Sequence, residues 1–129
     1  MKKDLVLNYN SKNVFKLEDF IWKLEGFNYL EKEKLIIIAS EIFDNIISYA
    51  KKKNENIYIR IKKNKTISIL FLFFSENFEM FINKTQKKMV YYDPKTNRYR
   101  GLGMKMCYNL SQSIHYRITI NYDAIRITI

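Results

Sequence analysis

The sequence predicts an α+β fold, a two-layer sandwich in which helices cover one face of a mostly antiparallel, mixed sheet. Two long segments near the start of the chain repeat apolar residues at intervals of three and four, as amphipathic helices do. Later segments alternate apolar and polar residues, and short polar turns join them in pairs, which favours antiparallel hairpins. Because 129 residues is the length of one ordinary domain, we expect residues 1–129 to form a single domain.

The first half of the chain is expected to contain one strand and two helices. Asp4–Tyr9 alternates and predicts a short, half-buried strand. Ser11 is the expected cap of a first helix that ends at Gly26. A capping-box pattern at residues 28–31 then opens the longest helix, about Leu30–Lys52.

The second half is expected to supply most of the sheet. Residues 57–62 alternate and pair, through a Lys-Asn-Lys turn, with Thr66–Phe74, whose apolar run predicts a central strand covered on both faces. Ser75–Lys88 has the spacing of a helix, whereas residues 88–100 contain a proline and no clear period and predict a loop. A helix from Met104 to about Ser111 and a terminal hairpin complete the chain.

The net charge is strongly positive, with 23 Lys and Arg against 13 Asp and Glu, or +10. A general bias toward lysine accounts for part of this excess. Residues 84–105, however, hold seven basic side chains against Asp93 alone. Such a segment suggests an anionic partner. Tyrosines between these cations could stack on bases, so nucleic-acid binding is a minor alternative.

The cysteine and histidine contents exclude two classes of protein. One Cys and one His rule out an internal disulfide framework and a cysteine-based zinc cluster. The longest apolar run, Ile67–Phe74, is too short to cross a bilayer, and no secretory signal follows the N-terminal lysines. We therefore expect a cytoplasmic protein without a membrane partner.

Glu41 and Asn45 interrupt the long helix and lie four residues apart, on one face. A buried carboxylate is costly unless it is paired or functional. An Asn at this spacing can orient the carboxylate, or offer its carbonyl oxygen to Mg²⁺, which prefers oxygen ligands. The alternative interpretation places Glu41 and Asp44 on the water-facing side of the helix.

A second motif, Arg100-Gly101-Leu102-Gly103, follows the basic segment and precedes a helix. Glycines let the backbone approach an anion closely, and helix N-terminal amides bind it. The alternative is an ordinary junction between a loop and a helix.

In order and spacing, these motifs resemble the GHKL nucleotide-binding fold shared by histidine kinases, gyrase B and Hsp90. Within it, the chain looks most like the bacterial anti-sigma-factor serine kinases. That family has Glu-x-x-x-Asn on a long helix, then Asp-x-Gly after two strands, a lid, and Gly-x-Gly before a helix. Residues 39–47 match the first box and residues 100–104 the last, and the resemblance covers nearly the whole chain.

The resemblance implies ATP and Mg²⁺ as cofactors and a serine on a partner protein as the phosphate acceptor. Glu41 would be the general base and Asn45 a Mg²⁺ ligand. It also implies a sigma factor or an anti-anti-sigma protein as partner, and a homodimer.

The phosphates would be held by the second motif. Gly101 and Gly103, with Leu102 between them, would let backbone amides approach the phosphates. Residues 84–100 would form the ATP lid, in which Arg100 could neutralise phosphate charge.

One box departs from the family. Ser75 stands where the family has the Asp that accepts a hydrogen bond from the adenine amino group, and Asn77 stands where it has Gly. A serine hydroxyl can still bond adenine, directly or through water, but without charge assistance. The leading expectation is thus a serine kinase with a weakened ATP site. The alternatives are a non-catalytic, protein-binding member of the fold and a basic nucleic-acid-binding module.

Overall fold

The computed structural model describes residues 1–50, 55–75, 78, 91–94, 97–100 and 102–129. Its helices are η1 (Ser11–Asn13, a 3-10 turn), α1 (Val14–Trp22), α2 (Tyr29–Tyr49) and α4 (Leu102–Leu110). Its strands are β1 (Lys2–Asn8), β2 (Asn56–Lys63), β3 (Ile67–Phe73), β4 (Tyr91–Asp93), β5 (Arg98–Arg100), β6 (Ser113–Ile118) and β7 (Asp123–Thr128).

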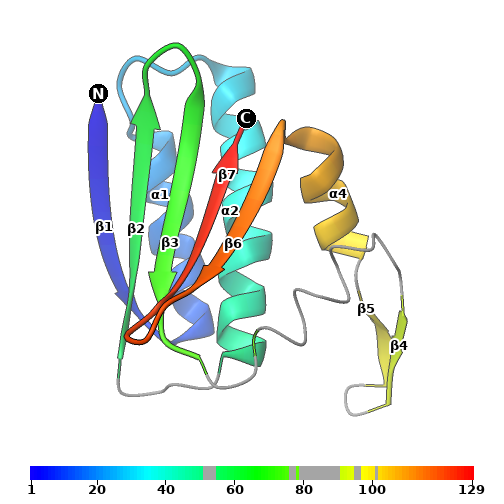
Figure 1. Ribbon diagram of the computed structural model, residues 1–129. Helices are drawn as coiled ribbons and strands as arrows, with labels where there is room; N and C mark the ends of the chain where they lie inside the picture. Colours follow the sequence, from blue (N-terminus) through cyan, green and yellow to red (C-terminus); the bar gives the residue numbers. More distant parts are fainter. Residues whose placement is uncertain (51–54, 76–77, 79–90, 95–96, 101) are drawn as a thin grey trace.

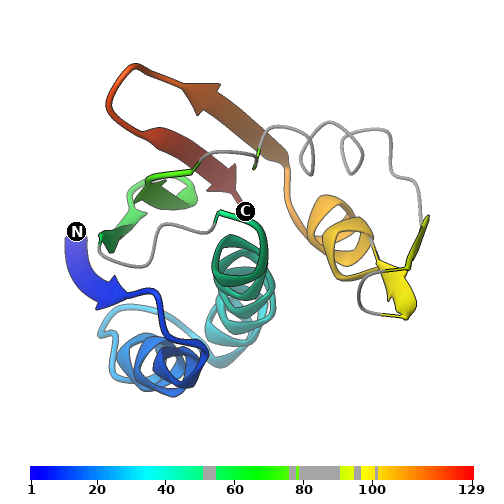
Figure 2. The same ribbon diagram turned by 90° about the horizontal axis from the view of Figure 1, so that it is seen from below.

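The larger sheet has the strand order β1-β2-β3-β7-β6, and α1, α2 and α4 lie on one of its faces (Figures 1 and 2). This confirms the predicted α+β sandwich. Every described pair of neighbouring strands is antiparallel, so the described part of the sheet is not mixed.

The core lies between the sheet and α2, which packs against both α1 and α4. Alternate residues of the central strands point toward the helices and are buried, among them Ile59, Phe71 and Ile125. The period-2 pattern of the strands and the helical stripe of α2 therefore meet in one apolar layer.

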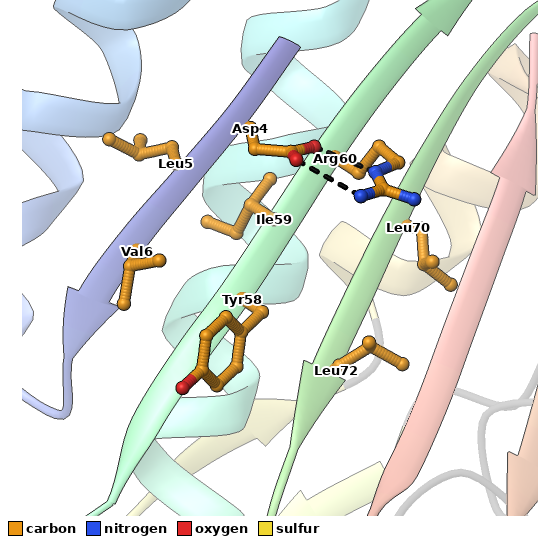
Figure 3. Close-up of a pocket in the computed structure, with 8 residues that line it drawn as sticks. All are labelled: Asp4, Leu5, Val6, Tyr58, Ile59, Arg60, Leu70 and Leu72. Atoms are coloured by element: carbon orange, nitrogen blue, oxygen red, sulfur yellow. Dashed lines mark hydrogen bonds and ion pairs between the residues drawn. The ribbon is translucent and has the colours of Figure 1, made fainter. Parts of the chain in front are cut away.

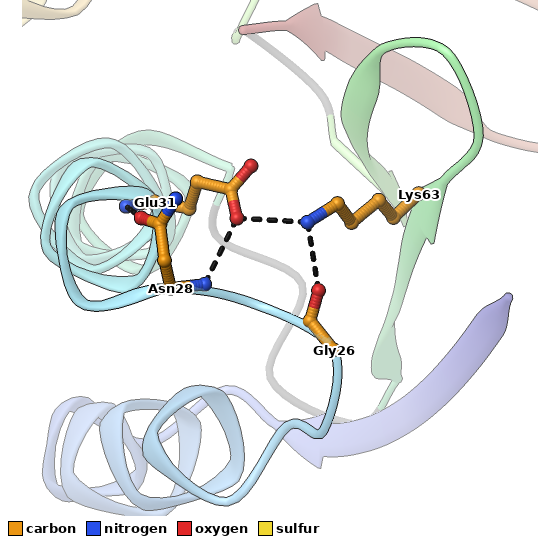
Figure 4. A network of polar contacts seen from close by, with 4 residues as sticks. All are labelled: Gly26, Asn28, Glu31 and Lys63. Atoms are coloured by element: carbon orange, nitrogen blue, oxygen red, sulfur yellow. Dashed lines mark hydrogen bonds and ion pairs between the residues drawn. The ribbon is translucent and has the colours of Figure 1, made fainter.

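A polar network fixes the start of α2 (Figure 4). Asn28 and Glu31 form the predicted capping box, with both hydrogen bonds 2.9 Å long. Lys63 Nζ lies 2.8 Å from Glu31 Oε1 and 2.7 Å from the carbonyl oxygen of Gly26. The hydrogen bond from Lys63 lowers the pKa of Glu31. The end of β2 is thereby tied to the turn between α1 and α2.

The first helix begins and ends differently from the prediction. Asn10, not Ser11, is the cap, and it caps the turn η1: its Oδ1 accepts a 3.0 Å bond from the Lys12 amide. The helix α1 then follows directly from Asn13, which makes no capping bond with its side chain. At the other end α1 stops at Trp22 rather than at Gly26. Gly26, with φ of +79°, lies in the connection to α2, where a left-handed residue is needed.

The prediction that both faces of β3 are covered is wrong. Its odd-numbered residues are buried against the helices, whereas Ser68, Leu70 and Leu72 are half-buried on the opposite side. No element of the described chain covers that side (Figure 2). We call it the outer sheet face. It is formed by the outward-pointing residues Lys2, Asp4, Val6, Tyr58, Arg60, Lys62, Ser68, Leu70, Leu72, Ser113, His115, Arg117, Ala124, Arg126 and Thr128.

The segment predicted as a loop contains a small ribbon. β4 pairs with β5, with Tyr91 opposite Arg100. Residues 84–90 and 95–96 of the lid expected over 84–100, and most of the helix expected over 75–88, lie outside the described residues. Phe78 is described: it is buried, and its ring meets that of Phe73 edge-on with centroids 5.0 Å apart.

Candidate functional site

The first element of the site is a hydrogen-bonded pair in the second half of α2. Asn45 Nδ2 donates to Glu41 Oε1 over 3.0 Å. Asn45 is buried and Glu41 is half-buried, although side chains of these two types are usually exposed to water. Asp44, between them, is exposed. The alternative that Glu41 and Asp44 share the wet side of the helix is therefore wrong for Glu41.

The second element is the start of α4, which lies against the Glu41 carboxylate. A methyl group added at Gly103 would overlap all three carboxyl atoms of Glu41. Residues 62 positions apart in the chain thus meet, and only glycine leaves room for the carboxylate at this point. Since the N-terminus of a helix has partial positive charge, it favours an anion here.

The same packing affects Cys107, one turn further along α4. Its Sγ lies 4.0 Å from the Ile38 carbonyl oxygen in the interface with α2. Burial, and then the negative charge of Glu41, raises the pKa of this thiol to about 12. Cys107 therefore stays protonated and belongs to the core.

A third polar cluster lies at the end of β3. Ser75 Oγ donates to Asp123 Oδ2 over 2.5 Å, and Tyr116 Oη donates to the same oxygen over 2.6 Å. Asp123 is buried, with 6% of its surface exposed. Ser75 and Asp123 also border a cavity of about 280 Å³ next to the β6–β7 turn. Ser75 replaces the Asp of the family, but a carboxylate is still present beside it, contributed by Asp123 of the neighbouring strand β7.

Tyr9 holds this end of the sheet in place. Its hydroxyl donates to the Phe74 carbonyl over 2.7 Å and accepts from the Phe74 amide over 2.9 Å. Burial raises the pKa of Tyr9 to about 12, and the charge of Asp123 adds to the shift. The backbone immediately before Ser75 is thus fixed by a side chain from the first strand.

A family model described as a GHKL domain matches residues 30–128. The match spans most of the chain. The chain belongs to the GHKL family. No protein of the curated set matches it. The resemblance at the level of the GHKL fold is therefore confirmed.

GHKL ATPase domains bind ATP, generally with Mg²⁺. The oxygen-rich pair on α2 fits such a cation, because the Nδ2 of Asn45 is used by Glu41 and leaves its Oδ1 as the ligand atom. No cluster of three His, Cys, Asp or Glu residues occurs in the described part of the chain, so a cation here would take its other ligands from phosphate and water.

The remaining predicted site residues are placed as follows. Leu102 begins α4 and is 62% exposed, and Arg100 ends β5. Gly101 and Asn77 lie outside the described residues. The structure brings Glu41, Asn45 and Gly103 together and places Ser75 beside Asp123.

Sequence reasoning missed Asp123 because it stands in an Asn-Tyr-Asp run that is typical of a turn. A signal was present, since Asp123 continues the alternation of Ile125 and Ile127 toward the core. Tyr9 was assigned to the first strand, but no sequence feature points to its bonds with Phe74.

Proposed function

We propose that this GHKL domain binds ATP with Mg²⁺ and transfers phosphate to a serine of a partner protein, as an anti-sigma-factor-like kinase. The observation that supports this best is the contact of Glu41 with Gly103 while Glu41 is bonded to Asn45. A carboxylate, an amide oxygen and a helix N-terminus then converge, which is the set of groups that phosphoryl transfer to a hydroxyl needs.

Each of the three groups has a distinct task. Glu41 accepts the proton of the attacking serine hydroxyl, and the bond from Asn45 holds its carboxylate in place. Asn45 Oδ1 is the protein ligand for Mg²⁺, which when bound would offset phosphate charge. The first amides of α4 would bind the phosphates, and the missing side chain of Gly103 leaves room for the Glu41 carboxylate beside them.

The Ser75–Asp123 pair supplies the base recognition that the missing Asp-x-Gly box would give. Because the Ser75 hydroxyl donates its hydrogen bond to Asp123, its oxygen is left as an acceptor, polarised by a nearby negative charge. It can accept from the amino group of adenine. Guanine has a carbonyl oxygen at the same position and would meet an acceptor. We therefore expect ATP to be preferred over GTP.

The partners follow from the same proposal. In this proposal the protein is a cytoplasmic homodimer that binds a sigma factor or an anti-anti-sigma protein. The competing function is a non-catalytic, protein-binding regulator, and the observation in its favour is that Ser75 replaces the family's Asp. The carboxylate of Asp123 beside Ser75 weighs against it.

The test compares Glu41→Gln with Asp44→Asn, which removes an equal charge from the exposed side of the same helix. Thermal unfolding is followed with and without millimolar Mg·ATP. Ligand at a hundredfold its Kd adds about 2.7 kcal/mol to the free energy of unfolding. We expect this shift in the parent protein and in both variants. Phosphate transfer to a serine substrate should be lost only in Glu41→Gln.

Absence of any shift with ATP would leave the non-catalytic regulator as the function. If Glu41→Gln lost ATP binding, or if it bound ATP and still transferred phosphate, the role of Glu41 as general base would be contradicted. For the base pocket, Asp123→Asn should weaken ATP about tenfold, which is 1.4 kcal/mol. Equal binding of ATP and GTP by the parent protein would refute the adenine assignment.

A further inference from the structure

The outer sheet face is an uncovered surface with two adjoining cavities. One, of about 340 Å³, lies over β1–β3 and is walled by Val6, Tyr58, Leu70 and Leu72 (Figure 3). The other, of about 230 Å³, lies over β3, β7 and β6 and shares Leu70 as a wall. Val6 and Tyr58 are 49% and 48% exposed. Large apolar residues in such a group, rather than scattered singly, mark an interaction surface.

The strand register places cations directly beside this apolar floor. Arg126 pairs with Leu70 on one side and His115 on the other, and Ala124 pairs with both Leu72 and Arg117. Both arginines are exposed and wall the smaller cavity. Neither has an ion-pair partner within the described part of the chain.

Arg60 is the contrasting case. Its Nε and Nη2 bind the two Asp4 oxygens at 2.7 and 3.0 Å (Figure 3), and the hydrogen bond lowers the pKa of Asp4. Among the residues that form the outer sheet face, Asp4 is the one acid. The basic residues are Arg60 and the exposed Lys2, Lys62, Arg117 and Arg126. The Asp4–Arg60 pair is internally satisfied, so the charge available to a partner is positive.

We propose that the outer sheet face binds an acidic segment of a partner protein. Apolar side chains of this segment would fill the two cavities on either side of Leu70, and carboxylates of the segment would pair with Arg117 and Arg126. A second copy of this chain fits less well, because two like-charged faces would meet. A nucleic acid also fits less well, because base stacking needs several aromatic side chains and this face offers only Tyr58 and His115. The proposal does not depend on nucleotide binding, since the helices and the outer sheet face lie on opposite sides of the sheet (Figure 2).

The experiment selects peptides from a random 12-residue library on the whole chain, and measures the Kd of the enriched peptides by fluorescence polarisation. We expect enriched peptides in which Asp or Glu flanks Leu, Ile or Phe. Arg126→Glu and Leu70→Thr should each weaken these peptides at least tenfold. Lys34→Glu, the same charge reversal at an exposed position of α2, should change the Kd less than twofold. Raising the salt from about 50 to 300 mM should weaken binding in the parent protein.

Several results would overturn the proposal. One is no enrichment, and another is enrichment of peptides that bind Arg126→Glu as well as the parent. A third is an oligonucleotide that binds the parent and is lost in Arg126→Glu while the peptides are not. A homodimer that dissociates in Arg126→Glu would assign the face to a second copy. Arg117→Glu, at the other exposed arginine, repeats the test if Arg126→Glu does not fold.

Discussion

Gly103→Ala tests the contact between α2 and α4 on which the proposed site depends. The new methyl group would overlap the Glu41 carboxyl group, which lies at the end of a flexible side chain. The carboxylate must therefore move, while the backbone stays. Movement breaks the 3.0 Å bond to the buried Asn45. The variant should remain folded but lose the geometry of the site.

The magnitude follows from two opposing effects. Loss of a hydrogen bond to a charged group costs about 1.5–3 kcal/mol. Alanine in place of glycine in a helix returns up to about 1 kcal/mol. The net loss in the free energy of unfolding is then about 0.5–3 kcal/mol, below the roughly 5–15 kcal/mol that holds a domain folded.

A double-mutant cycle gives this prediction its sharpest form. In a Glu41→Ala background the obstacle is absent, so Gly103→Ala should stabilise the protein by up to about 1 kcal/mol. Urea unfolding measures both differences, and the side-chain amide resonance of Asn45 should shift when Gly103→Ala is made in the parent. Gly26→Ala serves as a contrast, because at a φ of +79° it strains the backbone without contacting the α2 pair. If Gly103→Ala has the same sign and size in both backgrounds, Glu41 does not lie on Gly103.

Three further predictions concern stability. Tyr9→Phe removes both bonds to Phe74 and should cost about 1–3 kcal/mol in urea unfolding. Lys63→Met should cost about 1 kcal/mol near neutral pH. Because Lys63 lowers the pKa of Glu31, its contribution is present above the ordinary value of 4.5 and should fade in unfolding experiments at lower pH. The pKa of Cys107 is raised from 9.0 to about 12, so its contribution should be lost as pH rises between these values, by about 4 kcal/mol, and Cys107→Ala should flatten that part of the stability profile.

Matched variants and opposite results complete these tests. Tyr58→Phe, on the exposed outer sheet face, should leave stability within about 0.5 kcal/mol of the parent. Lys62 is exposed and next to Lys63, and the change in the free energy of unfolding caused by Lys62→Met should not vary with pH in the acid range. A stability profile above pH 9 that is identical in Cys107→Ala would show that the thiol does not titrate as described.

The sequence was sufficient for the fold because the information is local and periodic. The capping box at residues 28–31 set the start of α2, and strict alternation set β2 and β7. What it could not settle was which apolar residues are covered. Leu70 and Leu72 are as apolar as their buried neighbours, so composition alone suggested two covered faces. Only the number and placement of helices decides that one face stays open.

The contact within one helix could be predicted from the sequence, whereas the contact between residues of two strands could not. Glu41 and Asn45 are four residues apart, and helical geometry alone brings them together. Ser75 and Asp123 meet only because β3 and β7 are neighbours in the sheet, with Phe73 opposite Asp123. Strand order is a property of the whole chain, and no pattern near either residue reveals it.

Asp123 is also the residue whose presence is hardest to explain by stability. The core stripe of β7 continues through Ile125 and Ile127, and an apolar residue at position 123 would extend it. A buried carboxylate instead loses much of its hydration, and the bonds from Ser75 and Tyr116 offset that loss only in part. Replacing all three polar groups with apolar ones of similar shape would be neutral or stabilising on these grounds. A structural role therefore accounts less well for the cluster than the role that we propose for it, an acceptor kept in position for the amino group of a base.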